Sequence, residues 1–193
     1  MMIEIRWHGR GGQGAVTASE AVSAAAILDG RYALAFPEFG AERRGAPVRA
    51  YTRISDDPVI PRTPVTRPDI IVILDPSLMH PEYMEGLKPN GVVVANTPLP
   101  PEKTARILKV KPGVKIGVID ATKLAMEVLK RPIVNTAMLG ALVKTTGVVS
   151  LENVEKAIME KFPGKIGELN RELIRRAYKE TVVSMVKEEV LAS

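Results

Sequence analysis

Short aliphatic runs separated by glycine, proline and charged residues recur along the first two thirds of the chain. Their β-branched and alternating residues predict strands over 3–8, 32–36, 48–54, 69–74, 91–96 and 115–119. The runs 69–74 and 91–96 are almost entirely aliphatic, which is typical of strands covered on both faces. We therefore expect a sheet that lies between two layers.

Helical patterns follow the first strand and dominate after residue 120. The alanine-rich stretch 15–28 predicts a helix, and further helices are expected over 121–130, 135–146, 151–161 and 166–189. The last of these has apolar residues at spacings of three and four. We expect the last helix to cover the sheet or to face another subunit.

Two connections modify this picture. Only 11 residues join the strands 32–36 and 48–54, which is too short for a parallel crossover and predicts at least one antiparallel strand. Residues 55–68 contain four prolines and should be irregular. The expected fold is α/β, a three-layer α/β/α arrangement with a mostly parallel, mixed sheet. It begins strand, glycine loop, helix, and residues 1–193 form a single domain.

Composition excludes several classes of protein. The 193 residues are 46% hydrophobic and 25% charged, as in a folded globular chain. Cysteine is absent, which excludes disulfides, thiolate zinc sites and iron–sulfur clusters held by this chain. No aliphatic run approaches the roughly 20 residues of a membrane helix, and Glu4 and Arg6 interrupt any signal-peptide core, so we expect a cytoplasmic protein.

Charge favours an anionic ligand or partner. The formal net charge is +5, but aromatic residues make up only 4% and no basic stripe alternates with them, which argues against nucleic acid. The two histidines show no metal-site spacing, and His8 is interpreted as structural. We predict neither a metal site nor a catalytic residue in this chain.

A glycine loop is the main candidate site. Gly9, Gly11 and Gly14 fit the pattern G-x-G-x-x-G between a strand and a helix, where backbone amides and a helix N-terminus can hold phosphate. The alternative is a tight turn needed only for packing. The residues that we predict to bind in this loop are Arg10, Gly11, Gly12, Gln13 and Gly14.

A second cluster follows the strand 32–36. If that strand runs parallel to the first, Arg43 and Arg44 would lie near a phosphate held by the glycine loop. The alternative is a solvated charge pair. Asn135, at a helix entry, is a weaker candidate whose alternative role is capping, and capping is also the favoured role of Asp75. Arg49, Tyr51 and Arg53 share one strand face, which should meet solvent or another chain.

Four segments together resemble a known family. His8-Gly-Arg-Gly-Gly-Gln-Gly14, the loop 37–47, the strand 69–75 and the helix entry 135–140 are similar, in that order, to the gamma subunit of 2-oxoacid:ferredoxin oxidoreductases. The chain looks similar to the pyruvate synthases of archaea and deep-branching bacteria, and the likeness spans nearly the whole chain.

This resemblance implies a subunit of an assembly that decarboxylates a 2-oxoacid, such as pyruvate, and transfers the acyl group to coenzyme A. Thiamine diphosphate, Mg²⁺ and iron–sulfur clusters would belong to the alpha, beta and delta subunits, with ferredoxin as the electron acceptor. In this chain, the glycine loop, Arg43, Arg44 and Asn135 would hold coenzyme A.

Two other functions remain open from the sequence. The glycine motif also suits a free-standing NAD(P)-dependent oxidoreductase, although Glu38 is the only candidate acid for the ribose and two basic residues follow it. The chain could also be a structural subunit of the same complex whose glycine and arginine loops serve subunit contact.

Overall fold

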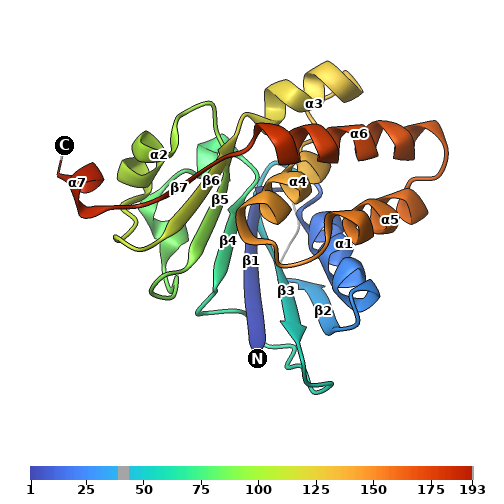
Figure 1. Cartoon of the computed structure of the whole chain (residues 1–193), viewed down its shortest axis with the longest axis horizontal. Coiled ribbons are helices and arrows are strands. Elements are labelled where there is room, and N and C mark those ends of the chain that lie inside the picture. Colours follow the sequence, from blue (N-terminus) through green and yellow to red (C-terminus); the bar gives the residue numbers. More distant parts are fainter. Residues whose placement is uncertain (39–43, 193) are drawn as a thin grey trace.

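One seven-stranded sheet forms the centre of the computed structural model, which describes residues 1–38 and 44–192 (Figure 1). Its order is β2-β3-β1-β4-β5-β6-β7. The strands are β1 Met2–Arg10, β2 Tyr32–Pro37, β3 Pro47–Ser55, β4 Ile70–Ile73, β5 Val92–Asn96, β6 Lys115–Ile119 and β7 Val182–Met185.

Strand directions confirm the expected α/β fold with a mixed sheet. β1, β4, β5 and β6 pair in parallel, whereas β3 is antiparallel to both β1 and β2, and β7 is antiparallel to β6. Because β3 lies between β1 and β2, these two strands run in the same direction. Five of the seven strands therefore share one direction, and the antiparallel member predicted from the short connection is β3.

Helices cover both faces of the sheet. α1 and α4 lie on one face, with α3, α5 and α6 packed around them, while α2 and two short 3-10 helices lie on the other (Figure 1). The helices are α1 Ala15–Leu28, α2 Pro101–Leu108, α3 Ala121–Leu129, α4 Asn135–Thr146, α5 Leu151–Lys161, α6 Lys165–Glu180 and α7 Glu188–Leu191, and the 3-10 helices are η1 Pro76–Leu78 and η2 Pro81–Met84. Within the described residues, no helix has the length and apolar character needed to span a membrane.

The alanines of α1 allow a close approach to β1 and β3. Ala18, on the face of α1 that packs against the sheet, is fully buried in the same core as Ile5 and Trp7 of β1. The Trp7 indole Nε1 donates to Thr52 Oγ1 at 3.0 Å, and Thr52 Oγ1 donates to the Ser19 carbonyl at 3.0 Å. The polar atoms buried with Trp7 are thus paired across three elements, which fixes α1 against the sheet.

The helix predicted over 166–189 is wrong beyond residue 180. α6 ends at Glu180, and β7 and α7 follow it. Thr181, Val182 and Val183 are consecutive β-branched residues that favour extended backbone, and β7 pairs with β6. α6 also packs on α4 rather than directly on the sheet. Gly140 of α4 allows this approach, because a Cβ there would overlap the Ile174 carbonyl.

The sequence pattern assigned no helix to α2. Pro101 stands at the first turn of this helix, where its missing N–H costs no hydrogen bond. Ala105 and Leu108 are buried against the sheet. α2 thus supplies part of the second layer.

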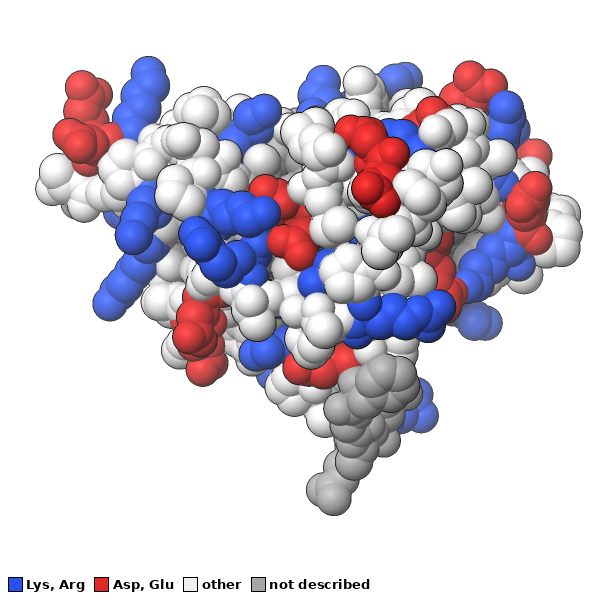
Figure 2. Space-filling view, turned by 90° about the horizontal axis from the view of Figure 1, so that it is seen from below, with Lys and Arg blue, Asp and Glu red and all other residues white. Residues whose placement is uncertain are grey.

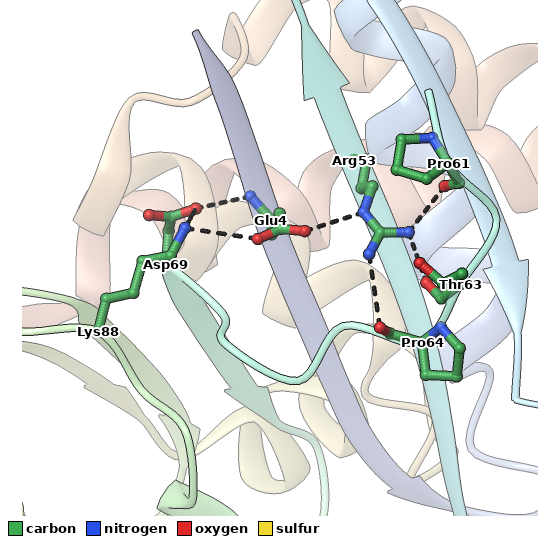
Figure 3. A network of polar contacts seen from close by, with 7 residues as sticks. All are labelled: Glu4, Arg53, Pro61, Thr63, Pro64, Asp69 and Lys88. Carbon is green, nitrogen blue, oxygen red and sulfur yellow. Dashed lines mark hydrogen bonds and ion pairs between the residues drawn. The ribbon is translucent and has the colours of Figure 1, made fainter. Parts of the chain in front are cut away.

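The irregular segment 55–68 covers one face of β1–β3 (Figure 3). The buried Arg53 guanidinium donates from Nε to Glu4 Oε1 at 2.9 Å and from Nη1 to the carbonyls of Pro61 and Thr63. This segment is irregular beyond Ser55, as predicted. The expectation of a solvent or partner face is wrong for Tyr51 and Arg53, which are buried by the chain itself, whereas Arg49 is exposed.

Candidate functional site

The glycine loop joins the end of β1 to the start of α1. Gly12 and Gly14 have φ of +90° and +80°, a left-handed conformation that other residues rarely adopt. A Cβ on Gly12 would meet nothing within 4 Å, so this part of the loop borders open space. Gly14 stands at the N-cap of α1, and no side chain caps the helix there.

Two backbone amides of the loop are free to bind a ligand. The Gly11 amide donates to the Ala46 carbonyl at 2.9 Å, and the Gln13 amide donates to the Arg10 carbonyl at 3.1 Å. Within the described residues, the amides of Gly12 and Gly14 have no acceptor. They add to the unpaired amides of the first turn of α1, which together favour an anion.

The side chains of Arg10 and Gln13 are engaged in contacts within the chain, although Arg10 is partly exposed. Arg10 donates from Nε to Ser77 Oγ at 2.9 Å and from Nη1 to the Gly45 carbonyl at 3.0 Å, and lies 3.9 Å from Asp75. Gln13 Oε1 accepts from the Arg10 amide at 2.7 Å, and Gln13 Nε2 donates to Asp75 Oδ2. These contacts fix the shape of the loop.

Asp75 connects the loop to the end of β4. It caps η1 by accepting from the Ser77 amide at 2.8 Å, which confirms the predicted capping role. Burial alone would raise the pKa of Asp75, but hydrogen bonds from Ser77 and Gln13 and the charge of Arg10 outweigh it and lower the pKa below its usual value. Its link to Gln13 has no sequence signal, because the two residues are 62 positions apart.

The second cluster meets the loop through Arg44. Because β1 and β2 run in the same direction, their carboxyl ends lie at one edge of the sheet. Gly11 and Arg44 form a β-bridge, the Gly45 amide donates to the Gly11 carbonyl at 3.3 Å, and Arg44 is exposed. Arg43 lies outside the described residues.

Asn135 places a second helix N-terminus beside the first. It is the first residue of α4 and is buried, and its Oδ1 accepts from the Thr136 amide at 3.0 Å. A Cβ on Gly14 would overlap the Asn135 amide group, with the Asn135 Cγ only 2.9 Å away. Asn135 does not cap α4, because Val134 holds that position and no side chain caps the helix. Two helices without side-chain caps thus begin side by side.

His8 lies beneath the loop as a structural residue. Its Nε2 accepts from Arg6 Nε at 2.9 Å, so the neutral ring carries its proton on Nδ1, which has no partner in the described chain. Burial, followed by the charges of Arg6 and Arg49, lowers the pKa of His8 to about 3. A neutral imidazole therefore prevails at physiological pH. Among the described residues, no group of His, Asp and Glu is arranged to hold a metal ion.

The chain matches the family model of pyruvate ferredoxin/flavodoxin oxidoreductase over residues 4–180. It is 51% identical to the pyruvate/ketoisovalerate oxidoreductases common subunit gamma of Thermococcus kodakarensis, over 94% of this chain and 98% of that protein. It is 53% identical to the pyruvate synthase subunit PorC of Methanothermobacter thermautotrophicus, over 93% of this chain and 96% of that protein.

Solved structures show the same fold. The pyruvate oxidoreductase subunit PORC of Thermotoga maritima superimposes with a TM-score of 0.85 at 43% identity, covering 95% of this chain and 98% of that one. The 2-oxoglutarate:ferredoxin oxidoreductase of Magnetococcus marinus superimposes with a TM-score of 0.74 at 20% identity, covering 97% of this chain but 32% of that one. With half of its residues shared with such subunits over almost their whole length, the chain belongs to the pyruvate ferredoxin/flavodoxin oxidoreductase family as a gamma-type subunit.

Proposed function

We propose that this chain holds coenzyme A within a pyruvate:ferredoxin oxidoreductase. The relatives are named for pyruvate and, in part, for ketoisovalerate, which supports pyruvate as the 2-oxoacid. Thiamine diphosphate, Mg²⁺ and the iron–sulfur clusters belong to the alpha, beta and delta subunits, and ferredoxin accepts the electrons. Coenzyme A supplies the thiol that accepts the acyl group.

The free amides of Gly12 and Gly14 carry this proposal. Gly14 lies where α1 and α4 begin side by side, so that both helix dipoles favour negative charge, and the neighbouring Gly12 borders open space. Coenzyme A carries a diphosphate and a 3′-phosphate. The guanidinium of Arg44, on the strand bridge to Gly11, is exposed at the same edge and would bind a phosphate oxygen together with Arg43.

Arg10 and Gln13 act in this proposal as positioning residues. Their side chains are engaged with Asp75, Ser77 and Gly45, which keeps the loop in the conformation that presents its amides. Asn135 supports the loop from the other side by packing against Gly14. Such pre-organisation restricts the freedom of the bound thiol, an effect that can lower a reaction barrier by several kcal/mol.

A fold relative supports the choice of ligand. The oxidoreductase of Magnetococcus marinus has been solved with 2-oxoglutarate, coenzyme A and succinyl-CoA bound, and a third of its chain has the fold described above. The net charge of +5 agrees with a polyanionic ligand.

Steady-state kinetics of the assembled complex test the proposal. Arg44→Ala should raise the KM for coenzyme A roughly tenfold, since a hydrogen bond to a charged group contributes about 1.5 kcal/mol, and Arg43→Ala should act in the same direction. The KM for pyruvate should stay within about twofold of the original. Arg62→Ala removes an exposed arginine from the segment 55–68 and serves as the matched control. Equal effects on both substrates would contradict the proposal.

A structural role without ligand is the remaining alternative, because the relatives are subunits rather than free-standing dehydrogenases. In that case Arg44→Ala would weaken assembly and leave the kinetics of coenzyme A unchanged in whatever complex forms. Measuring subunit content by native mass spectrometry alongside KM separates the two outcomes. NADH binding to the chain, which the glycine motif also allows, should be absent from the same preparation.

A further inference from the structure

A cationic surface lies at the edge of the sheet opposite the glycine loop. There β4, β5 and β6 begin, and two adjoining pockets of about 480 Å³ and 460 Å³ share Lys88, Pro89 and Asn90. We call this surface the basic edge, and its cationic residues are Arg31, Arg67, Lys88, Lys109, Lys111 and Lys115. No part of it is used by the site for coenzyme A.

Most of these charges are unpaired. Asp69 is the one acidic residue among those that line the two pockets, and Lys88 binds it at 3.1 Å. Within the described chain, Arg67, Lys109, Lys111 and Lys115 form no ion pair. Figure 2 looks onto this edge and shows Lys and Arg side chains gathered on its left half, with acidic groups at their border. Such a surface attracts anions over a range of several ångströms.

Arg31 adds an observation of a different kind. Its Nε lies 3.3 Å from Asp56, but its Nη2 is buried and has no acceptor in the described structure. The guanidinium of Arg31 is thus only partly paired within the described chain. Arg31 lines the same pocket as Lys88 and Lys115.

The walls of the pockets indicate which kind of anion fits. The partly exposed side chains of Met84 and Leu87 line the larger pocket together with its four cations, and the buried Val110 and Val114 lie at its base. An inorganic phosphate would leave these apolar walls unused. Neither pocket is lined by an aromatic residue that could stack on a base, which disfavours single-stranded nucleic acid. A protein segment with both carboxylates and apolar side chains satisfies the whole surface.

We propose that the basic edge docks an acidic segment of a partner protein. Carboxylates of that segment contact Arg67, Lys109 and Lys111, and its apolar side chains contact Met84 and Leu87. Because the glycine loop is at the other end of the strands, the docked partner and coenzyme A do not compete. The inference therefore stands independently of the proposed function.

Binding of a short Glu-rich peptide to the full chain, followed by fluorescence anisotropy, tests this proposal. The variant Lys109→Glu/Lys111→Glu should raise the Kd for the peptide at least tenfold, and added salt should weaken binding to the original chain more than to this variant. Lys109 has a positive φ of 51°, so Arg67→Glu/Lys111→Glu provides a second variant that leaves this backbone position unchanged and should show the same loss.

The control carries the same change in net charge elsewhere. Lys156→Glu/Lys179→Glu alters two exposed lysines of α5 and α6 and should change the Kd less than twofold. Equal weakening by the control would show a general effect of net charge and overturn the proposal. The proposal would also be overturned if inorganic phosphate or a single-stranded oligonucleotide displaced the peptide when added at the same total concentration of negative charge.

Discussion

Single residues of the glycine loop have distinct physical roles. At Gly12, only the left-handed backbone favours glycine, since the space beyond its Cα is open. At Gly14, the backbone is also left-handed, and in addition Asn135 leaves no room for a side chain. Arg10 and Gln13, which the motif suggested as ligand contacts, are engaged within the protein. The motif was thus sufficient to locate the loop, but it could not show which groups of the loop are free.

Replacing Gly14 tests this distinction. Gly14→Ala should lower the free energy of unfolding by about 2–4 kcal/mol, because a left-handed alanine costs about 1–2 kcal/mol and displacing Asn135 adds an overpacking cost. Gly12→Ala should show only the backbone cost. Urea denaturation of both variants measures the difference, and equal losses would mean that Asn135 does not press on Gly14.

His8 makes stability depend on pH. Its pKa is lowered to about 3 in the folded chain and is about 6.5 when unfolded. Only the unfolded state therefore gains a proton as the pH falls below 6.5, so this contribution to stability is constant above pH 6.5 and decreases toward pH 3. Between pH 7 and pH 5 it should amount to about 2 kcal/mol of lost unfolding free energy.

The variant His8→Gln isolates this effect. It keeps a side-chain oxygen as a possible acceptor for Arg6 but does not titrate, so its unfolding free energy should fall about 2 kcal/mol less between pH 7 and pH 5. His80→Gln changes an exposed imidazole and should retain the full decrease. Identical pH dependence of His8→Gln and the original chain would contradict the buried neutral histidine.

At the scale of elements, the central strands of the sheet could be predicted from the sequence, whereas the helix α2 and the edge strand β7 could not. Buried aliphatic runs identified β4 and β5, and the short connection identified an antiparallel strand. α2 was not predicted, and β7 was assigned to a helix because its residues continue the spacing of α6. Both errors concern short elements that tertiary pairing stabilises more than local propensity does.

The close packing of α4 on α6 predicts the sign of the change in stability when Gly140 is replaced by alanine. In an isolated helix, Gly→Ala stabilises by up to about 1 kcal/mol. Gly140→Ala should instead destabilise by about 1–3 kcal/mol, because its Cβ would overlap the Ile174 carbonyl and lie 2.9 Å from the Ala177 Cβ. Thermal unfolding followed by circular dichroism measures the change, and a raised melting temperature would contradict the close approach of the two helices.

For the whole molecule, the direction of the strands separates the two proposed sites, which lie at opposite edges of the sheet. The carboxyl ends of β1 and β2 gather the glycine loop and Arg44, and the opposite edge gathers the unpaired cations of the basic edge. The sequence predicted the first edge, because motif and topology both point to it. It did not predict the second, whose cations come from segments between residues 31 and 115 that only the folded sheet brings together.

The most direct test of the central claim is a structure of the assembled complex determined with coenzyme A. The account predicts phosphate oxygens within hydrogen-bonding distance of the Gly12 and Gly14 amides, with the Arg44 guanidinium beside them. Coenzyme A bound elsewhere, with both amides covered by a neighbouring subunit, would contradict it.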